Sequence, residues 1–210
     1  MRLGRGVHRA AFQVRMSVRP DPDRLSGAHV VLFPYPSEAA ELKSRLENEV
    51  TALRCLEQIG PIFRFPQLLG AVDYEGAIVL YERFVEGVAL DLRVGRCLVG
   101  NPWDVAGEIA ARVHDLTLVA EQLNGFATRR EHAMHSMSVF EGLGESTFKD
   151  AHAWCLDHLP PEGAPSTLLH GDLSGQNIRV DPQGRVAPAI IDWTFALRGD
   201  PAHEMAIITQ

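Results

Sequence analysis

The chain has 210 residues, of which 46% are hydrophobic and 22% are charged, with a formal net charge of -7; this suffices for one substantial core or for two small lobes that meet at a cleft. The net negative charge argues against a nucleic-acid partner, because phosphates require a concentrated basic face. No stretch is apolar enough to span a bilayer, and the N-terminal segment lacks the apolar core of a signal peptide. We therefore expect a cytoplasmic protein that has no membrane partner. The sequence does not indicate its oligomeric state.

The first part of the chain predicts a small sheet and one long helix. The apolar runs that predict strands cover residues 3–14 (two strands around a turn with Gly4 and Gly6), 28–32, 68–72 and 77–80. Residues 37–56 predict a helix, because their apolar side chains recur on one helical face. The segment 80–87 then becomes polar, which is typical of a connection that leaves a sheet.

Helices are expected in the middle of the chain. Asn101 and Pro102 are a favourable helix start, with asparagine as the cap and proline in the first turn. A further helix is expected over residues 146–158, before two prolines. His132 and His135 have no convincing third ligand, so we interpret their segment as a surface helix and not as a metal site.

Two short segments near the C-terminus place three polar side chains together. Asp172 follows an apolar run and a glycine, so its carboxylate projects from a loop where the chain turns sharply. Asn177 precedes the next strand, residues 181–184 have the proline and glycine of a turn, and residues 186–191 return as a second strand. This hairpin is expected to carry Asn177 and Asp192 to the same end, beside Asp172.

These three side chains match the chemistry of phosphoryl transfer. Mg²⁺ prefers hard oxygen ligands and keeps several waters, so the Asp192 carboxylate, the Asn177 amide and nucleotide phosphates make a suitable metal site. Asp172, free of metal, would align a hydroxyl group or accept its proton. The set therefore predicts transfer of a phosphoryl group from a nucleotide.

Four motifs follow one another in this region. They are His170-Gly171-Asp172, Asn177, Ile191-Asp192-Trp193 and Gly199-Asp200-Pro201-Ala202. In this order they resemble the aminoglycoside phosphotransferase and choline kinase family, and four ordered motifs are far more specific than one. The resemblance implies an α+β, bilobal, protein-kinase-like fold, with a small antiparallel-sheet N-lobe over residues 1–86 and a helical C-lobe over residues 87–210.

The resemblance also implies roles for individual residues of the C-lobe. Asp172 corresponds to the catalytic aspartate, while Asn177 and Asp192 correspond to the magnesium ligands. His170 is expected to order the backbone of the catalytic loop, and Asp200 belongs to the Gly-Asp-Pro segment that braces it.

On the nucleotide side the implied roles fall on the N-lobe. Gly4 and Gly6 correspond to the turn that covers the phosphates, and Glu49 to the helix glutamate that pairs with a strand lysine. Glu82 and Phe84 lie in the link between the lobes, whose backbone meets the adenine edge. The implied cofactors are ATP, with GTP as the alternative, and Mg²⁺.

The sequence departs from the family pattern at two places. Phe33 stands about where a phosphate-binding lysine or arginine is expected. Lys43 and Arg15 are the basic residues that could take over this role. Near the end, Glu204 replaces a common aspartate, and the sequence stops soon afterwards, which predicts a fold truncated at its C-terminus. The alternatives are a fragment, a reduced acceptor site, or a site completed by another subunit.

The residues together predict an ATP-dependent phosphotransferase that acts on a hydroxyl of a small molecule, either aminoglycoside-like or an amino alcohol. The alternative is a nucleotide-binding pseudokinase or truncated regulatory remnant, which Phe33 and the early C-terminus favour. A protein kinase is disfavoured, because residues 192–199 are too few for a segment that docks a peptide.

Overall fold

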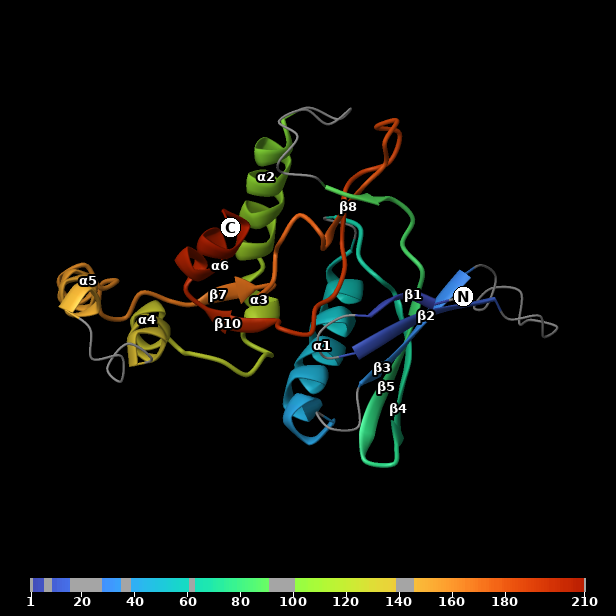
Figure 1. The fold of residues 1–210 in the computed structure, drawn as a ribbon, viewed down its shortest axis with the longest axis horizontal. Helices are drawn as coiled ribbons and strands as arrows, with labels where there is room; N and C mark the ends of the chain where they lie inside the picture. Colours follow the sequence, from blue (N-terminus) through green and yellow to red (C-terminus); the bar gives the residue numbers. More distant parts are fainter. Residues whose placement is uncertain are drawn as a thin grey trace.

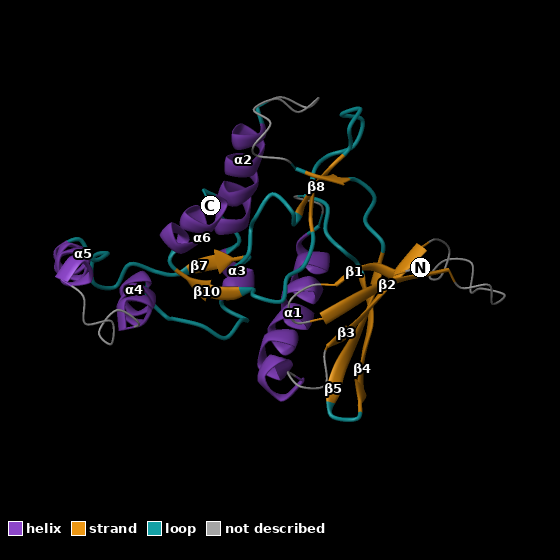
Figure 2. Cartoon of the chain, viewed as in Figure 1, coloured by secondary structure: helices purple, strands orange, loops and turns teal. Residues whose placement is uncertain are grey.

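The structure, a computed structural model, describes residues 2–5, 9–15, 28–34, 39–60, 63–90, 101–138 and 146–209. A five-stranded sheet lies on one side, most helices lie on the other, and helix α1 (Ala39–Ile59) stands between them (Figures 1 and 2). Among the described helices, none combines the length and the apolar character that crossing a bilayer requires.

The small lobe is built on an antiparallel sheet. Its strands are β1 (Arg2–Arg5), β2 (Arg9–Arg15), β3 (Ala28–Pro34), β4 (Leu68–Tyr74) and β5 (Ala77–Arg83). Their order across the sheet is β1-β2-β3-β5-β4, and every neighbouring pair is antiparallel. The strands predicted from the apolar runs are therefore confirmed, and the third extends beyond its predicted end to Pro34.

Helix α1 packs against one face of this sheet. Its Leu46 forms a buried cluster with Leu32 of β3 and Leu80 of β5. Because side chains alternate along a strand, Phe33 lies on the opposite face, where it is 41% exposed and contacts the edge of the Phe12 ring. The helix predicted over residues 37–56 thus forms over Ala39–Ile59, and the residues just before it lie outside the described chain.

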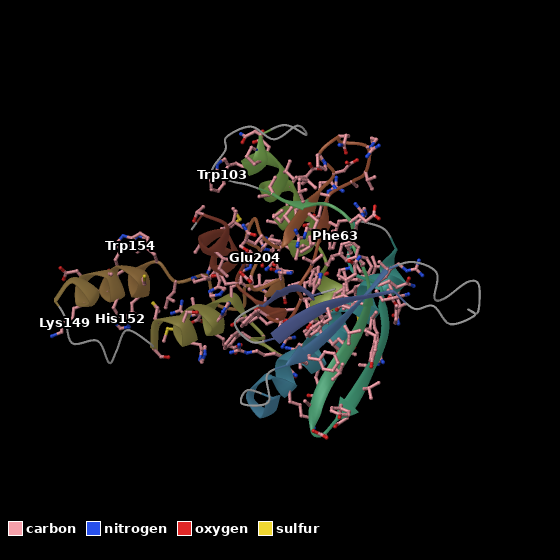
Figure 3. The ribbon with its side chains drawn as sticks, turned by 45° about the vertical axis from the view of Figure 1, so that its right-hand side comes forward. Phe63, Trp103, Lys149, His152, Trp154 and Glu204 are labelled. Carbon is pink, nitrogen blue, oxygen red and sulfur yellow. The ribbon has the colours of Figure 1, made fainter. Side chains whose placement is uncertain are left out.

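The large lobe is mainly helical. Its helices are α2 (Pro102–His114), α3 (Thr117–Ala120), α4 (Arg129–Ser138), α5 (Ser146–Asp157) and α6 (Pro201–Ile208). Asn101 caps α2, because its Oδ1 accepts a hydrogen bond from the Trp103 amide at 3.1 Å. Figure 3 shows Glu204 of α6 among the central elements, whereas Trp154 lies on α5 at the periphery.

Short strand pairs complete the large lobe and carry its functional loops. They are β7 (Thr167–Leu169) with β10 (Leu197–Gly199), and β8 (Ile178–Val180) with both β6 (Val88–Ala89) and β9 (Ala189–Ile190). The pairing of β8 with β9 confirms the predicted hairpin. The pairing of β7 with β10 was not predicted, because strands this short have no measurable periodicity.

The main core joins α1 to the large lobe. Its buried residues include Leu53 and Leu56 of α1, Val113 of α2 and Trp193, all at most 2% exposed. The Trp193 ring stacks on Phe63 with 6.0 Å between the ring centroids. Since Trp193 directly follows Asp192, packing in the core determines where that aspartate emerges.

Candidate active site

His170 connects the loop after β7 to the end of β9. Its side chain is fully buried, Nε2 donates a hydrogen bond to the Ile191 carbonyl at 3.0 Å, and Nδ1 accepts one from the Asp172 amide at 3.3 Å. The two ring nitrogens therefore have different roles, Nε2 as donor and Nδ1 as acceptor. The ring also meets Trp193 edge to face, with centroids 4.8 Å apart. His170 therefore fixes the loop after β7 through both nitrogens of its ring.

Gly171 allows the chain to turn sharply before Asp172. Its φ is +80°, and a Cβ at this position would lie 2.1 Å from the Phe195 carbonyl oxygen. Its amide donates to Glu204 Oε1 at 2.8 Å, and Glu204 Oε2 lies 3.0 Å from His114 Nε2. Glu204 is fully buried, so one carboxylate ties the loop that carries Asp172 to α6 and α2.

Asp172 and Asn177 are in direct contact. Asn177 Nδ2 donates to both the main-chain oxygen and Oδ2 of Asp172, each at 2.9 Å. A turn between them is closed by the Ser174 amide, which donates to the Asp172 carbonyl at 2.8 Å. Both side-chain bonds use the Asn177 nitrogen, so its Oδ1 takes no part in the contact with Asp172.

Asp192 follows strand β9 and lies beside Asn177. The Ile191 amide donates to the Asn177 carbonyl at 2.9 Å, which brings the following residue beside Asn177. Asp192 has a φ of 66°, and its Oδ1 accepts a hydrogen bond from Thr194 Oγ1 at 2.7 Å. The structure therefore brings Asp172, Asn177 and Asp192 together.

Burial and neighbouring charges determine the electrostatics of the site. Burial raises the pKa of Asp172, and the negative charge of Asp192 adds to this effect, against the influence of His170 and Asn177. Two carboxylates this near repel each other, and a divalent ion beside them relieves that repulsion. Within the described residues, no group of three or more His, Cys, Asp and Glu side chains is arranged to hold a metal. The set of one carboxylate and one amide oxygen fits Mg²⁺ that keeps water and phosphate ligands.

The residues expected to meet the nucleotide lie on the small lobe. Gly4 is in β1, whereas Gly6 lies outside the described residues. Glu82 is in β5 and is 5% exposed. Phe84 follows β5, and its amide donates to the Ala28 carbonyl at 2.9 Å, so this amide is engaged within the sheet.

Glu49 is completely buried on α1, and its Oε2 lies 3.2 Å from Thr194 Oγ1. The β3 side chains that pack toward α1 are apolar, namely Val30 and Leu32. A basic residue at position 33 would thus lie on the sheet face away from Glu49. Of the two substitutes considered, Lys43 is an exposed residue of α1, and Arg15 ends β2 with its side chain outside the described part.

Asp200 occupies the start of α6. Its carboxylate accepts a hydrogen bond from the Ala202 amide at 3.2 Å and caps the helix, and its own amide donates to His132 Nδ1 at 2.8 Å. The predicted helix around His132 is present as α4, but the prediction of a surface position is wrong for His132, which is 4% exposed. Packing on Phe126, with ring centroids 4.6 Å apart, accounts for this burial.

Sequence reasoning missed two contacts of the site. Thr194 and the pair of His114 with Glu204 were given no role in it, although each touches a residue of the catalytic or metal-binding loops. Thr194 follows Asp192 by two residues, which is the only local signal that a hydroxyl could reach that carboxylate.

Comparison with known proteins gives a family and a fold. The model of the family described as "Phosphotransferase enzyme family" matches residues 18–209. A curated relative, acyl-CoA dehydrogenase family member 11 of Gallus gallus, is 24% identical over 113 residues, which cover 50% of this chain and 14% of that protein.

Three solved structures show the shared fold. A putative aminoglycoside phosphotransferase of Ralstonia eutropha has a TM-score of 0.69 at 17% identity, over 98% of this chain and 61% of that chain. The Streptomyces rimosus aminoglycoside phosphotransferase with ADP and streptomycin gives 0.58 at 19%, over 86% and 70%. The Plasmodium vivax ethanolamine kinase gives 0.59 at 13%, over 94% and 56%.

These likenesses confirm the predicted bilobal, protein-kinase-like α+β fold. This chain spans about three fifths of the Ralstonia protein and a much smaller part of the curated relative.

Proposed function

The chain belongs to the phosphotransferase enzyme family, and from this premise we propose that it transfers the terminal phosphate of ATP to a hydroxyl group of a small molecule. The observation that carries the proposal is the convergence of Asp172, Asn177 and Asp192 in one site. This set suits phosphoryl transfer, because that reaction needs little more than positioning and charge stabilisation.

In the proposed mechanism each residue has one task. Asp172 aligns the acceptor hydroxyl for in-line attack and takes its proton as the oxygen bonds to phosphorus and the bond to ADP breaks. Asn177 Oδ1 and the Asp192 carboxylate hold Mg²⁺, which neutralises phosphate charge when it is bound. Asn177 also keeps Asp172 in place, since its Nδ2 donates to the Asp172 carboxylate.

We propose an aminoglycoside-like compound or an amino alcohol as the acceptor. The structural relatives include an aminoglycoside phosphotransferase with streptomycin and an ethanolamine kinase, and both acceptors carry amines beside hydroxyl groups. The net charge of -7 favours approach of such cations, although it describes the surface as a whole. ATP is the proposed donor and GTP the alternative.

The second candidate function is nucleotide binding without transfer. It is favoured by the absence of Lys and Arg from β3, whose α1-facing positions are Val30 and Leu32. A basic residue there would normally bind the nucleotide phosphates and pair with the helix glutamate. Such a protein would act on a partner through its nucleotide-bound state.

Incubation with labelled ATP, Mg²⁺ and a panel of aminoglycosides, ethanolamine, choline and sugars distinguishes the two functions. We expect one acceptor class to be phosphorylated, and Asp172→Asn to lower the rate by about 10²–10⁴-fold while nucleotide binding persists. Asp73→Asn is the matched control, because Asp73 only accepts a hydrogen bond in the turn between β4 and β5. Nucleotide binding with no transfer to any acceptor would favour the non-catalytic function, and normal turnover by Asp172→Asn would remove its proposed role.

A further inference from the structure

One face of α1 contacts residues 194–196, which follow Asp192. The Arg45 guanidinium lies 4.7 Å from the centroid of the Phe195 ring, and Asn48 Nδ2 donates to the Ala196 carbonyl at 3.2 Å. Glu49 Oε2 lies 3.2 Å from Thr194 Oγ1. Positions 45, 48 and 49 share one helical face, so we call these three contacts the α1 clamp.

The clamp reaches the metal-binding aspartate through Thr194. This side chain is 2% exposed, and its hydroxyl lies between two carboxylates, 2.7 Å from Asp192 Oδ1 and 3.2 Å from Glu49 Oε2. A hydroxyl has a single hydrogen, and the shorter distance indicates that Thr194 donates it to Asp192. The contact therefore fixes which way the Asp192 carboxylate is turned.

Asp192 depends on such a contact because its backbone is unusual. A φ of 66° is in the left-handed region, which is unfavourable for a residue with a Cβ, although less so for aspartate than for most. On one side it is held by the buried ring of Trp193. On the other side the Thr194 hydroxyl holds the carboxylate by a hydrogen bond.

We propose that Thr194 is a positioning residue that orients the Asp192 carboxylate for Mg²⁺ through the hydrogen bond of its hydroxyl. The inference rests on the proposed function, because Asp192 is a metal ligand only if the site binds Mg²⁺ with a nucleotide. It assigns a role to a residue outside the proposed catalytic and metal-binding set.

The test is the Mg²⁺ dependence of ATP binding, measured by calorimetry with Mg²⁺ and with EDTA. Thr194→Val keeps the shape of the side chain and removes the hydroxyl, so we expect the gain in ATP affinity from Mg²⁺ to fall by about 10- to 100-fold, with the affinity in EDTA unchanged. Thr194→Ser keeps the hydroxyl and should restore the gain. Asp192→Asn gives the reference for loss of the metal ligand.

The matched control is Thr51→Val on the same helix. Thr51 Oγ1 bonds only to the Glu47 carbonyl one turn away, so this variant should keep the full gain from Mg²⁺. If Thr194→Val does not fold, the comparison of Thr194→Ala with Thr194→Ser makes the same contrast.

The outcomes separate the inference from the function on which it rests. An unchanged Mg²⁺ gain in Thr194→Val, beside a large loss in Asp192→Asn, overturns the inference and leaves the proposed function intact. A wild-type protein that gains no ATP affinity from Mg²⁺ overturns both. An equal loss of affinity with and without Mg²⁺ in Thr194→Val and Thr194→Ser alike would show a purely structural role and also overturn the inference.

Discussion

At the scale of single residues, Gly171 controls where the Asp172 carboxylate, the proposed catalytic group, lies. Its φ of +80° and the 2.1 Å that would separate a Cβ from the Phe195 oxygen leave no room for a side chain. The amide of the same residue is bound by the buried Glu204, so the loop has no freedom to move away from the contact.

We therefore expect Gly171→Ala to lower both stability and phosphate transfer. The left-handed backbone alone costs about 1–2 kcal/mol with a Cβ, and the contact with the Phe195 carbonyl adds to it. Gly76→Ala is the control, because Gly76 has a φ of +82° with nothing within 4 Å of a Cβ. Chemical unfolding of both variants measures the difference; equal losses would show that the contact with Phe195 is unimportant.

The sequence allowed the core of this site to be predicted, but not the residues that hold it. Asp172, Asn177 and Asp192 could be placed together because a turn and a short hairpin determine their relation locally. Glu49 reaches Thr194 across 145 positions in the chain, and such a contact leaves no periodic signal in the sequence. The distant contact therefore needed the three-dimensional structure.

At the scale of elements, α4 and α6 are joined through a buried histidine. His132 Nδ1 accepts a hydrogen bond from the Asp200 amide, and its ring lies between Phe126 and His203. Burial, together with His203, lowers the pKa of His132 from 6.5 to about 4. The folded protein thus keeps this imidazole neutral, as its role of acceptor requires.

This shift predicts a loss of stability in mild acid. As the pH falls from 6.5 toward 4, the unfolded chain binds the proton and folded His132 does not, so unfolding becomes easier. Between pH 7 and pH 5 the expected loss from this one group is about 2 kcal/mol.

Urea unfolding at the two pH values measures this loss. In His132→Asn, whose amide oxygen can still accept the Asp200 hydrogen bond, we expect the contribution to disappear. His158→Asn is the control, because His158 is exposed and stacks on Trp154. A wild-type pH dependence retained in His132→Asn would contradict the assignment.

Element types were predictable where patterns are long. The α1 periodicity and the cap at Asn101 identified their helices, although α1 ends three residues beyond its predicted end at Leu56. The two- and three-residue strands β6, β7, β9 and β10 exist only because a partner strand lies beside them. Their pairing depends on contacts between distant segments, which the β-strand propensity of single residues does not predict.

At the scale of the whole molecule, the proposed nucleotide bridges the two lobes and should stabilise both. A ligand that binds only the folded state adds about 2.7 kcal/mol at a concentration of about 100 times its Kd. For a chain of this size that corresponds to a rise of roughly 5–10 °C in Tm. We expect this rise with Mg²⁺ and ATP, and a smaller one with EDTA present.

Thermal unfolding with ATP or GTP, each with Mg²⁺ or EDTA, measures the effect and ranks the two donors. Asp192→Asn should lose the part of the rise that depends on Mg²⁺, because its carboxylate is the proposed ligand. No rise at millimolar concentrations of either nucleotide would contradict the proposed site.

The position of α1 has a consequence for how the two lobes can move relative to each other. Leu46 packs against the sheet, while Leu53 and Leu56, farther along the same helix, are buried in the core of the large lobe. A rigid rotation of one lobe against the other would therefore break the packing at one end of this helix. We therefore expect the sheet and the large lobe to move together with α1 as one body.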